Sequence, residues 1–183
     1  MSHTMESSAK RIILALPLDH TYGRAIMRGA CKYSWAEARE EWRIDYAVTP
    51  YCMPPDMAGA DGAVAGLSTS ALSRQLERPG IPVVNVAGIF ETSFCPRVTW
   101  DNFRIGRMVG EHLLARRYQR LIFVGPGNNE WFARQRLTGF ENALAEASLA
   151  PIRFDDQIDR DWLHKIEKPV AVFAANDEFG RGT

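Results

Sequence analysis

The chain has 183 residues, of which 46% are hydrophobic and 24% charged, an ordinary composition for a globular protein that buries a core. Lysine and arginine balance aspartate and glutamate at 22 each, so the formal net charge is zero. This balance argues against a nucleic-acid-binding surface spread over the chain, which would carry a basic excess. The three cysteines show no Cys-x-x-Cys spacing and the four histidines no metal-ligand spacing, so we expect neither a disulfide framework nor a metal site.

The N-terminal segment is polar and has no apolar core of signal-peptide length. No apolar run approaches the roughly 20 residues that span a bilayer. We therefore expect a disordered N-terminus over residues 1–10, a cytoplasmic protein, and no membrane contact.

Short apolar runs alternate with stretches of helical periodicity along the whole chain. The first half predicts strands at 11–16, 42–48, 61–66, 82–86 and 97–100, and helices from 21 or 22 to about 39 and from 68 or 70 to 77. The second half predicts helices at 101–117, 131–148 and 160–166, and strands at 120–124, 152–154 and 169–175. Such alternation is typical of βαβ units and indicates an α/β fold with mostly parallel sheets. We place a hinge after Trp100, between a lobe at 11–100 and a lobe at 101–183.

The first loop carries polar groups where ligands bind in doubly wound sheets, beyond the carboxyl end of a strand. Asp19 and His20 can hydrogen-bond hydroxyls, and Tyr22 can stack on the face of a sugar. The alternative is that Asp19 or Thr21 caps the following helix.

The second half offers four more candidates for ligand contact and one further helix cap. Asp101 and Asn102 together fit a helix start, with a second role of Asp101 facing the cleft between the lobes left open. Trp131 offers an apolar face to a pyranose ring, and Arg136, a cation near a helix start, needs a partner such as a hydroxylated or carboxylated ligand; the alternative is a surface arginine beside a partly buried tryptophan. Asn176 carries donor and acceptor together, which suits a sugar hydroxyl, or it is a turn residue. Asp177 fits the cap of a following helix.

Signals for catalysis are weak. The segment 125–129 (GPGNN) follows a strand but lacks both G-x-G-x-x-G and the P-loop pattern, and no lysine follows it. The serines lie in no G-x-S-x-G elbow, and no pair of carboxylates stands out as an acid–base dyad. We therefore expect neither an enzyme nor a cofactor.

The order and spacing of these motifs resemble the periplasmic-binding-protein-like sensor domain of the lactose-repressor and ribose-binding-protein superfamily. The motifs are VTWDNFRIGRMVGEHLLARRYQRLIFVGP from Val98, RLTGF at Arg136 and AAND at Asn176. Within the superfamily the likeness is greatest to xylose operon regulators, through the first loop, the WDN at a strand end and the turn from Trp131 to Arg136. The resemblance covers residues 11–181.

The resemblance implies two doubly wound parallel-sheet lobes joined by a hinge. It implies that Arg136 and Asn176 contact a sugar, that the loop with Asp19, His20 and Tyr22 lines the pocket, and that Asp101 lies in the cleft-proximal turn. The corresponding function is a homodimeric transcription regulator that binds a pentose such as D-xylose between its lobes.

Only ten residues precede the first strand, too few for the N-terminal helix-turn-helix unit of lactose-repressor-type regulators. The xylose-type likeness implies instead a DNA-binding domain C-terminal to this chain, and a second lobe truncated at Thr183. DNA is then a partner only through that domain. Two alternatives stay open: a solute-binding protein of a sugar transporter, against which the missing signal peptide argues, and a doubly wound enzyme.

Overall fold

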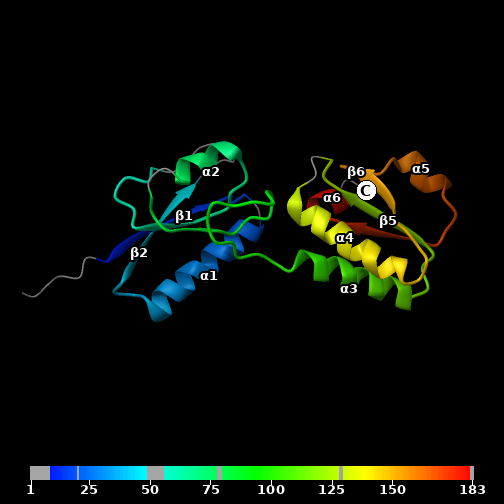
Figure 1. Cartoon of the computed structure of the whole chain (residues 1–183), viewed down its shortest axis with the longest axis horizontal. Helices are drawn as coiled ribbons and strands as arrows, with labels where there is room; N and C mark the ends of the chain where they lie inside the picture. Colours follow the sequence, from blue (N-terminus) through cyan, green and yellow to red (C-terminus); the bar gives the residue numbers. More distant parts are fainter. Residues whose placement is uncertain (1–8, 20, 49–55, 78–79, 128–129, 182–183) are drawn as a thin grey trace, which may run out of the picture. The chain divides into compact units, whose positions relative to one another are not determined.

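The structure, a computed structural model, describes residues 9–19, 21–48, 56–77, 80–127 and 130–181 (Figure 1). The chain divides into two compact units, Met1–Thr99 and Trp100–Thr183, here called the N-terminal and C-terminal units. Each unit is built of parallel strands and helices, so the expected α/β class is confirmed.

The N-terminal unit contains one parallel sheet in the order β2-β1-β3-β4. Its elements are β1 (Lys10–Leu16), α1 (Thr21–Glu37), β2 (Trp42–Val48), β3 (Gly62–Ala65), α2 (Ser70–Glu77) and β4 (Val83–Asn85). Strand β1 begins at Lys10, so the expected disordered segment 1–10 is wrong at its last residue; residues 1–8 lie outside the described part.

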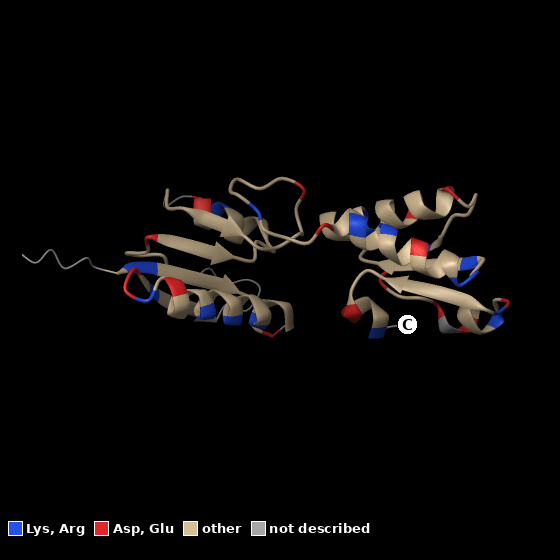
Figure 2. Ribbon diagram, turned by 90° about the horizontal axis from the view of Figure 1, so that it is seen from below, with Lys and Arg blue, Asp and Glu red and all other residues tan. Residues whose placement is uncertain are grey.

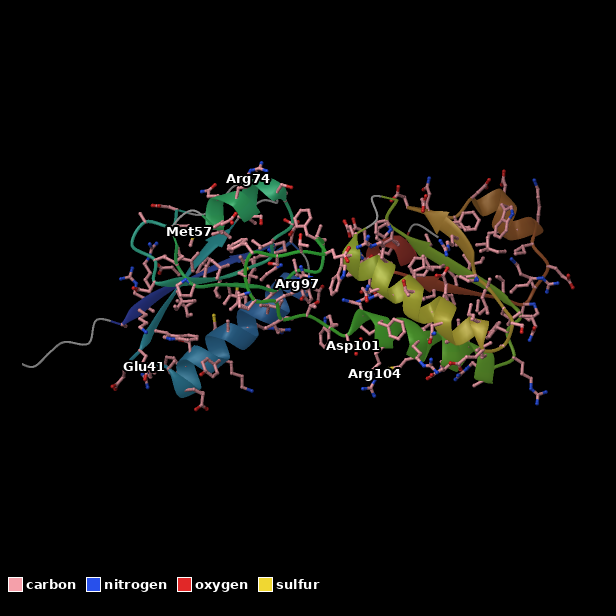
Figure 3. All side chains as sticks on the ribbon, viewed as in Figure 1. Glu41, Met57, Arg74, Arg97, Asp101 and Arg104 are labelled. Carbon is pink, nitrogen blue, oxygen red and sulfur yellow. The ribbon has the colours of Figure 1, made fainter. Side chains whose placement is uncertain are left out.

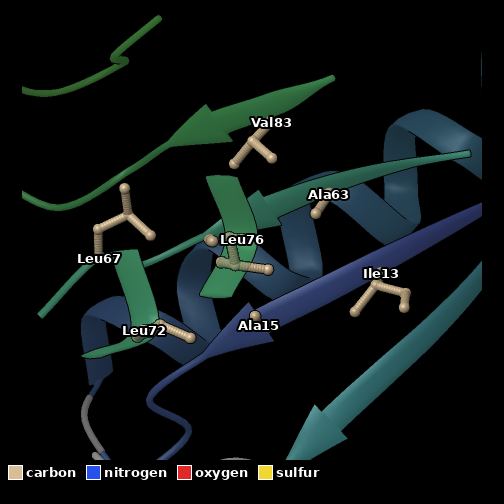
Figure 4. Packing of buried hydrophobic residues seen from close by; sticks show 8 residues of the cluster. Ile13, Ala15, Ala63, Leu67, Leu72, Leu76 and Val83 are labelled. Atoms are coloured by element: carbon tan, nitrogen blue, oxygen red, sulfur yellow. The ribbon is translucent and has the colours of Figure 1, made fainter. Parts of the chain in front are cut away.

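Helices cover both faces of this sheet. Strand β1 contributes to both cores, because it lies inside the sheet and its side chains alternate between the two faces. On one face Ile13 and Ala15 pack with Leu72 and Leu76 of α2 (Figure 4). On the other face Leu14 belongs to a cluster that includes side chains of α1. The four residues from Ile13 to Leu16 are at most 2% exposed, as the continuous apolar run predicted.

The fifth strand expected at 97–100 is wrong. Only an isolated bridge joins Asn85 to Arg97, with Val98 N donating to Asn85 O at 2.9 Å. Strand β4 itself ends at Asn85, so no partner strand continues beside the next residues, and Val98 and Trp100 are 66% and 63% exposed. Arg97 instead donates to Phe90 O at 2.6 Å, closing the preceding loop on itself.

The C-terminal unit contains a second parallel sheet in the order β6-β5-β7. Its elements are α3 (Asn102–Ala115), β5 (Arg120–Gly125), α4 (Trp131–Ala145), β6 (Ile152–Asp155), α5 (Arg160–Lys165), β7 (Val170–Ala174) and α6 (Asp177–Arg181). Helices α3 and α4 lie side by side and share a core cluster with Leu121 and Phe123 of β5 (Figure 1). Ile122 and Val124 point the other way, to a cluster with Trp162 of α5.

Helices α3 and α4 both end two to three residues before the sequence pattern predicts. Arg117 and Ser148 adopt positive φ angles of 60° and 56° just beyond them. The amides of Tyr118 and Leu149 then bond back to Leu113 O and Leu144 O at 3.3 and 3.0 Å. This left-handed closure ends a helix while satisfying its last carbonyls, and it does so here without a glycine.

Candidate functional site

The first loop is held in shape by Arg24. Its guanidinium donates to Leu18 O and Asp19 O, each at 2.8 Å, and to Thr21 Oγ1 at 3.1 Å. Asp19 is exposed and follows β1 at the carboxyl edge of the sheet. His20, the second candidate in this loop, lies outside the described residues.

Tyr22 connects the first loop to the end of β4. Its hydroxyl donates to Val86 O at 2.5 Å, one residue beyond the end of that strand. The residue is 39% exposed. With its proton committed to the main chain, Tyr22 is better suited to cover an apolar surface than to donate to a ligand.

Asp101 is the N-cap of α3. Its Oδ1 accepts a hydrogen bond from Arg104 N at 2.9 Å, and both residues lie at the start of the helix in Figure 3. The helix-start interpretation is therefore confirmed. Contact between the exposed Asp101 carboxylate and a ligand stays a prediction.

Arg136, in the second turn of α4, joins three elements of the C-terminal unit. Its Nε donates to Asn102 Oδ1 of α3 at 3.0 Å, and its Nη1 donates to Ala175 O just beyond β7. The guanidinium carbon lies 5.3 Å from the ring centroid of Phe132. The sequence predicts that this cation needs a partner. Its partners include groups of the protein itself, and they lie on elements that only the fold brings together.

Sequence reasoning missed the part played by Asn102, which it grouped with Asp101 as a helix start. The residue is only 3% exposed. Its Oδ1 receives the Arg136 bond and its Nδ2 donates to Trp100 O at 3.2 Å. The available signal was glycine at every fourth position after it, Gly106 and Gly110, because such spacing lets another helix approach closely.

That close approach fixes the backbone around Arg136. A Cβ added to Gly106 of α3 would lie 1.8 Å from Arg136 O, and one added to Gly139 of α4 would lie 1.9 Å from Phe103 O. The two helices thus meet backbone to backbone, with no room for a side chain at either position. Packing therefore holds the backbone of Arg136 in place, while the hydrogen bonds hold its side chain.

Asn176 lies directly after Ala175, whose carbonyl receives the Arg136 bond. Its Oδ1 accepts from Glu178 N at 2.9 Å and from Phe179 N at 3.1 Å. Asn176 is therefore the cap of α6, and the expectation that Asp177 caps this helix is wrong. Because capping uses only the side-chain oxygen, the amide nitrogen is left as a donor at the carboxyl edge of the sheet.

Trp131 is the first residue of α4 and is half-buried. The helix follows β5, and β5 pairs with β7, which leads to Asn176. Trp131, Arg136 and Asn176 therefore belong to neighbouring connections within one unit. Asp19 and Tyr22 belong to the N-terminal unit.

These groups are suited to recognition. Guanidinium and amide N–H groups bind hydroxyl oxygens, and aromatic faces cover the apolar side of a ring. In the described ranges no group of three or more His, Cys, Asp or Glu is placed to hold a metal ion. Acidic and basic residues are interspersed on both units (Figure 2).

A helix that crosses a membrane must be both long and apolar. Among the residues that the structure describes, none forms a helix with both the length and the apolar character that crossing a bilayer requires.

Known proteins share this architecture. A LacI family transcriptional regulator from Enterococcus faecium with bound ribose is 23% identical, with a TM-score of 0.71 over 94% of this chain and 69% of that one. A second such regulator with bound ribose, from Enterococcus faecalis V583, is 18% identical, with a TM-score of 0.69 over 94% and 69%. The xylose-binding transcription activator XylR is 19% identical, with a TM-score of 0.79 over 97% of this chain and 50% of that one.

The chain thus spans half the length of XylR. A search of curated proteins found no match. The model of periplasmic binding proteins and the sugar binding domain of the LacI family matches residues 57–160, more than half of the chain. The expected periplasmic-binding-protein-like α/β fold is confirmed, and the chain belongs to the family of periplasmic binding proteins and LacI-type sugar-binding domains.

Proposed function

We propose that this chain is the sugar-sensing part of a cytoplasmic, homodimeric bacterial transcription regulator, and that its effector is a pentose such as D-xylose. The observation that carries the proposal is the bond from Arg136 to Ala175 O. It places a guanidinium beside Asn176, whose amide nitrogen is a donor at the carboxyl end of β7. Two kinds of donor beside each other suit the vicinal hydroxyls of a sugar.

Each remaining candidate has a role in this proposal. Trp131 and Tyr22 each offer an aromatic face to the apolar side of a sugar ring. Asp19, His20 and Asp101 accept hydrogen bonds from hydroxyls. A sugar that binds one conformation of the protein more tightly than another shifts the equilibrium toward that conformation, and this difference in affinity is the signal.

The family and the ligands of the relatives support a sugar as effector. Two of the relatives were solved with bound ribose, and a third is described as xylose-binding. We propose that DNA is contacted by a separate domain, and that the sugar is bound and released unchanged.

The test is isothermal titration calorimetry with a panel of pentoses and hexoses. Arg136→Ala should weaken pentose binding by about 10- to 100-fold, since hydrogen bonds to a charged group contribute about 1.5–3 kcal/mol. Arg116→Ala is the matched control: it removes an exposed arginine that bonds His112 at the end of α3, and it should bind as the wild type does. Unchanged affinity in Arg136→Ala would remove this arginine from the site.

A solute-binding protein of a transporter is the second candidate, because the matched family includes periplasmic binding proteins. It predicts the same sugar affinity and no effect of sugar on DNA. Retention of operator DNA by the native protein, measured with and without the sugar, separates the two. An enzyme would convert the sugar, and NMR of an incubated mixture should show the pentose unchanged.

A further inference from the structure

The amide of Asn102 is bound at both ends inside the C-terminal unit. Its Oδ1 accepts from Arg136 Nε at 3.0 Å, and its Nδ2 donates to Trp100 O at 3.2 Å. At 3% exposure the side chain has almost no contact with solvent. A polar group buried to this degree is costly unless its bonds are made, so both contacts matter for the orientation of the amide.

Capping does not explain this residue. The first turn of α3 is capped by Asp101, whose carboxylate accepts from Arg104 N at 2.9 Å. Space filling does not explain it either, because an apolar side chain would fill the volume without needing hydrogen bonds. What an asparagine supplies here is an acceptor for Arg136 and a donor for the main chain of Trp100.

The acceptor fixes the plane of the Arg136 guanidinium. An arginine side chain has many rotamers and loses much entropy when it is held in one. The bond from Nε to Asn102, together with the bond from Nη1 to Ala175 O, holds the planar group at two of its nitrogens. Its other N–H groups then have a fixed direction before any ligand arrives, which reduces the entropy lost on binding.

We propose that Asn102 is a positioning residue of the sugar site: it orients Arg136 for the ligand and ties that arginine to Trp100, the first residue of the C-terminal unit. This rests on the proposed function, because Arg136 must contact the sugar for its orientation to affect affinity. Asn102 itself does not touch the sugar. Its effect on affinity passes through Arg136.

The test is a double-mutant cycle on the whole chain, with D-xylose and D-ribose as probes in calorimetry. Asn102→Ala should weaken binding about tenfold when Arg136 is present and have no effect in an Arg136→Lys background, because lysine has no Nε to orient. Asn102→Asp keeps the acceptor and loses only the donor to Trp100, so its affinity should stay within about threefold of the wild type. If Asn102→Ala does not fold, Asn102→Ser takes its place. The serine hydroxyl is too short to reach Arg136 Nε, so this variant also removes the acceptor.

Phe140→Leu controls for loss of stability. Phe140 is fully buried in α4 and packs against Phe173 with ring centroids 5.2 Å apart, so its replacement destabilises the same unit without touching the polar network. The folded variant should bind as the wild type does. The inference alone would be overturned if Asn102→Ala weakened sugar binding equally in the Arg136 and the Arg136→Lys backgrounds. It would also be overturned if Asn102→Ala bound sugar with wild-type affinity. A wild-type protein that binds neither sugar would overturn the proposed function, and the inference with it.

Discussion

Replacing Gly106 with alanine tests the backbone-to-backbone contact of α3 and α4 that carries Arg136. The added Cβ would lie 1.8 Å from Arg136 O, 2.7 Å from Arg136 C and 2.9 Å from Phe140 N, whereas ordinary contact begins at 3.4 Å. All three atoms are backbone, so no side chain can rotate away. The helices must separate until the shortest distance rises from 1.8 to at least about 3.0 Å, which loosens the contacts on both sides.

Overpacking of this kind costs about 1–3 kcal/mol, and rigid backbone on the far side places this site at the upper end. Alanine recovers about 1 kcal/mol of helix propensity over glycine, which leaves a net loss of roughly 2 kcal/mol. For a unit of this size, 1 kcal/mol shifts Tm by about 4–8 °C, so we expect a fall of about 8–16 °C. Differential scanning calorimetry measures the shift, and hydrogen exchange of α3 and α4 peptides assigns it to the C-terminal unit.

Gly29 provides the matched control. It is an exposed glycine in α1 with nothing within 4 Å of its added Cβ, so Gly29→Ala should stabilise the N-terminal unit by up to about 1 kcal/mol. A Gly106→Ala variant as stable as Gly29→Ala would mean that α3 and α4 are not in backbone contact.

Three further outcomes follow from the local geometry. Asn176→Asp keeps an oxygen for the two capping bonds but loses the amide donor. Its Tm should stay near that of the wild type, while calorimetry should show about tenfold weaker pentose binding. Asn176→Ala should lose pentose affinity and also the cap, which costs about 0.5–2 kcal/mol of stability in urea unfolding. Tyr22→Phe removes the bond to Val86 O and should cost about 0.5–1.5 kcal/mol in the same assay, with pentose affinity unchanged because the ring remains. The hydrogen bond from Arg11, with the nearby charge of Arg43, holds the pKa of Asp45 below its ordinary value of 3.8. The Asp45 carboxylate therefore stabilises the fold above pH 3.8 and loses that effect as the pH falls through the lowered pKa. Urea midpoints measured from about pH 5 to pH 2 should fall less steeply in Asp45→Asn than in the wild type.

The elements that the sequence predicts well are those whose pattern is local. The run from Ile13 to Leu16 marks a strand buried on both faces, and helical spacing from Asn102 onward marks α3. The expected strand at 97–100 fails for a reason that no local pattern contains. Its own residues favour a strand, but β4 ends at Asn85 and offers no partner beyond one bridge.

The candidate site shows the same division. The need of Arg136 for partners follows from its place near a helix start, but which partners it takes depends on the packing of α3 against α4 and on the end of β7. The choice between Asn176 and Asp177 as the cap depends on where α6 begins, and sequence patterns place helix ends poorly. Asn102 is exposed or buried according to tertiary packing alone, and the glycines that allow that packing lie one and two turns further on.

A crystal structure of the protein with D-xylose would show whether Arg136 and Asn176 bind the sugar. We expect sugar hydroxyls within hydrogen-bonding distance, about 2.7–3.2 Å, of the Arg136 guanidinium and the Asn176 amide nitrogen, with the oxygen of Asn176 still bonded to Glu178 N and Phe179 N. A pentose bound without contact to either side chain, or crystals that take up no sugar at saturating concentration, would contradict it.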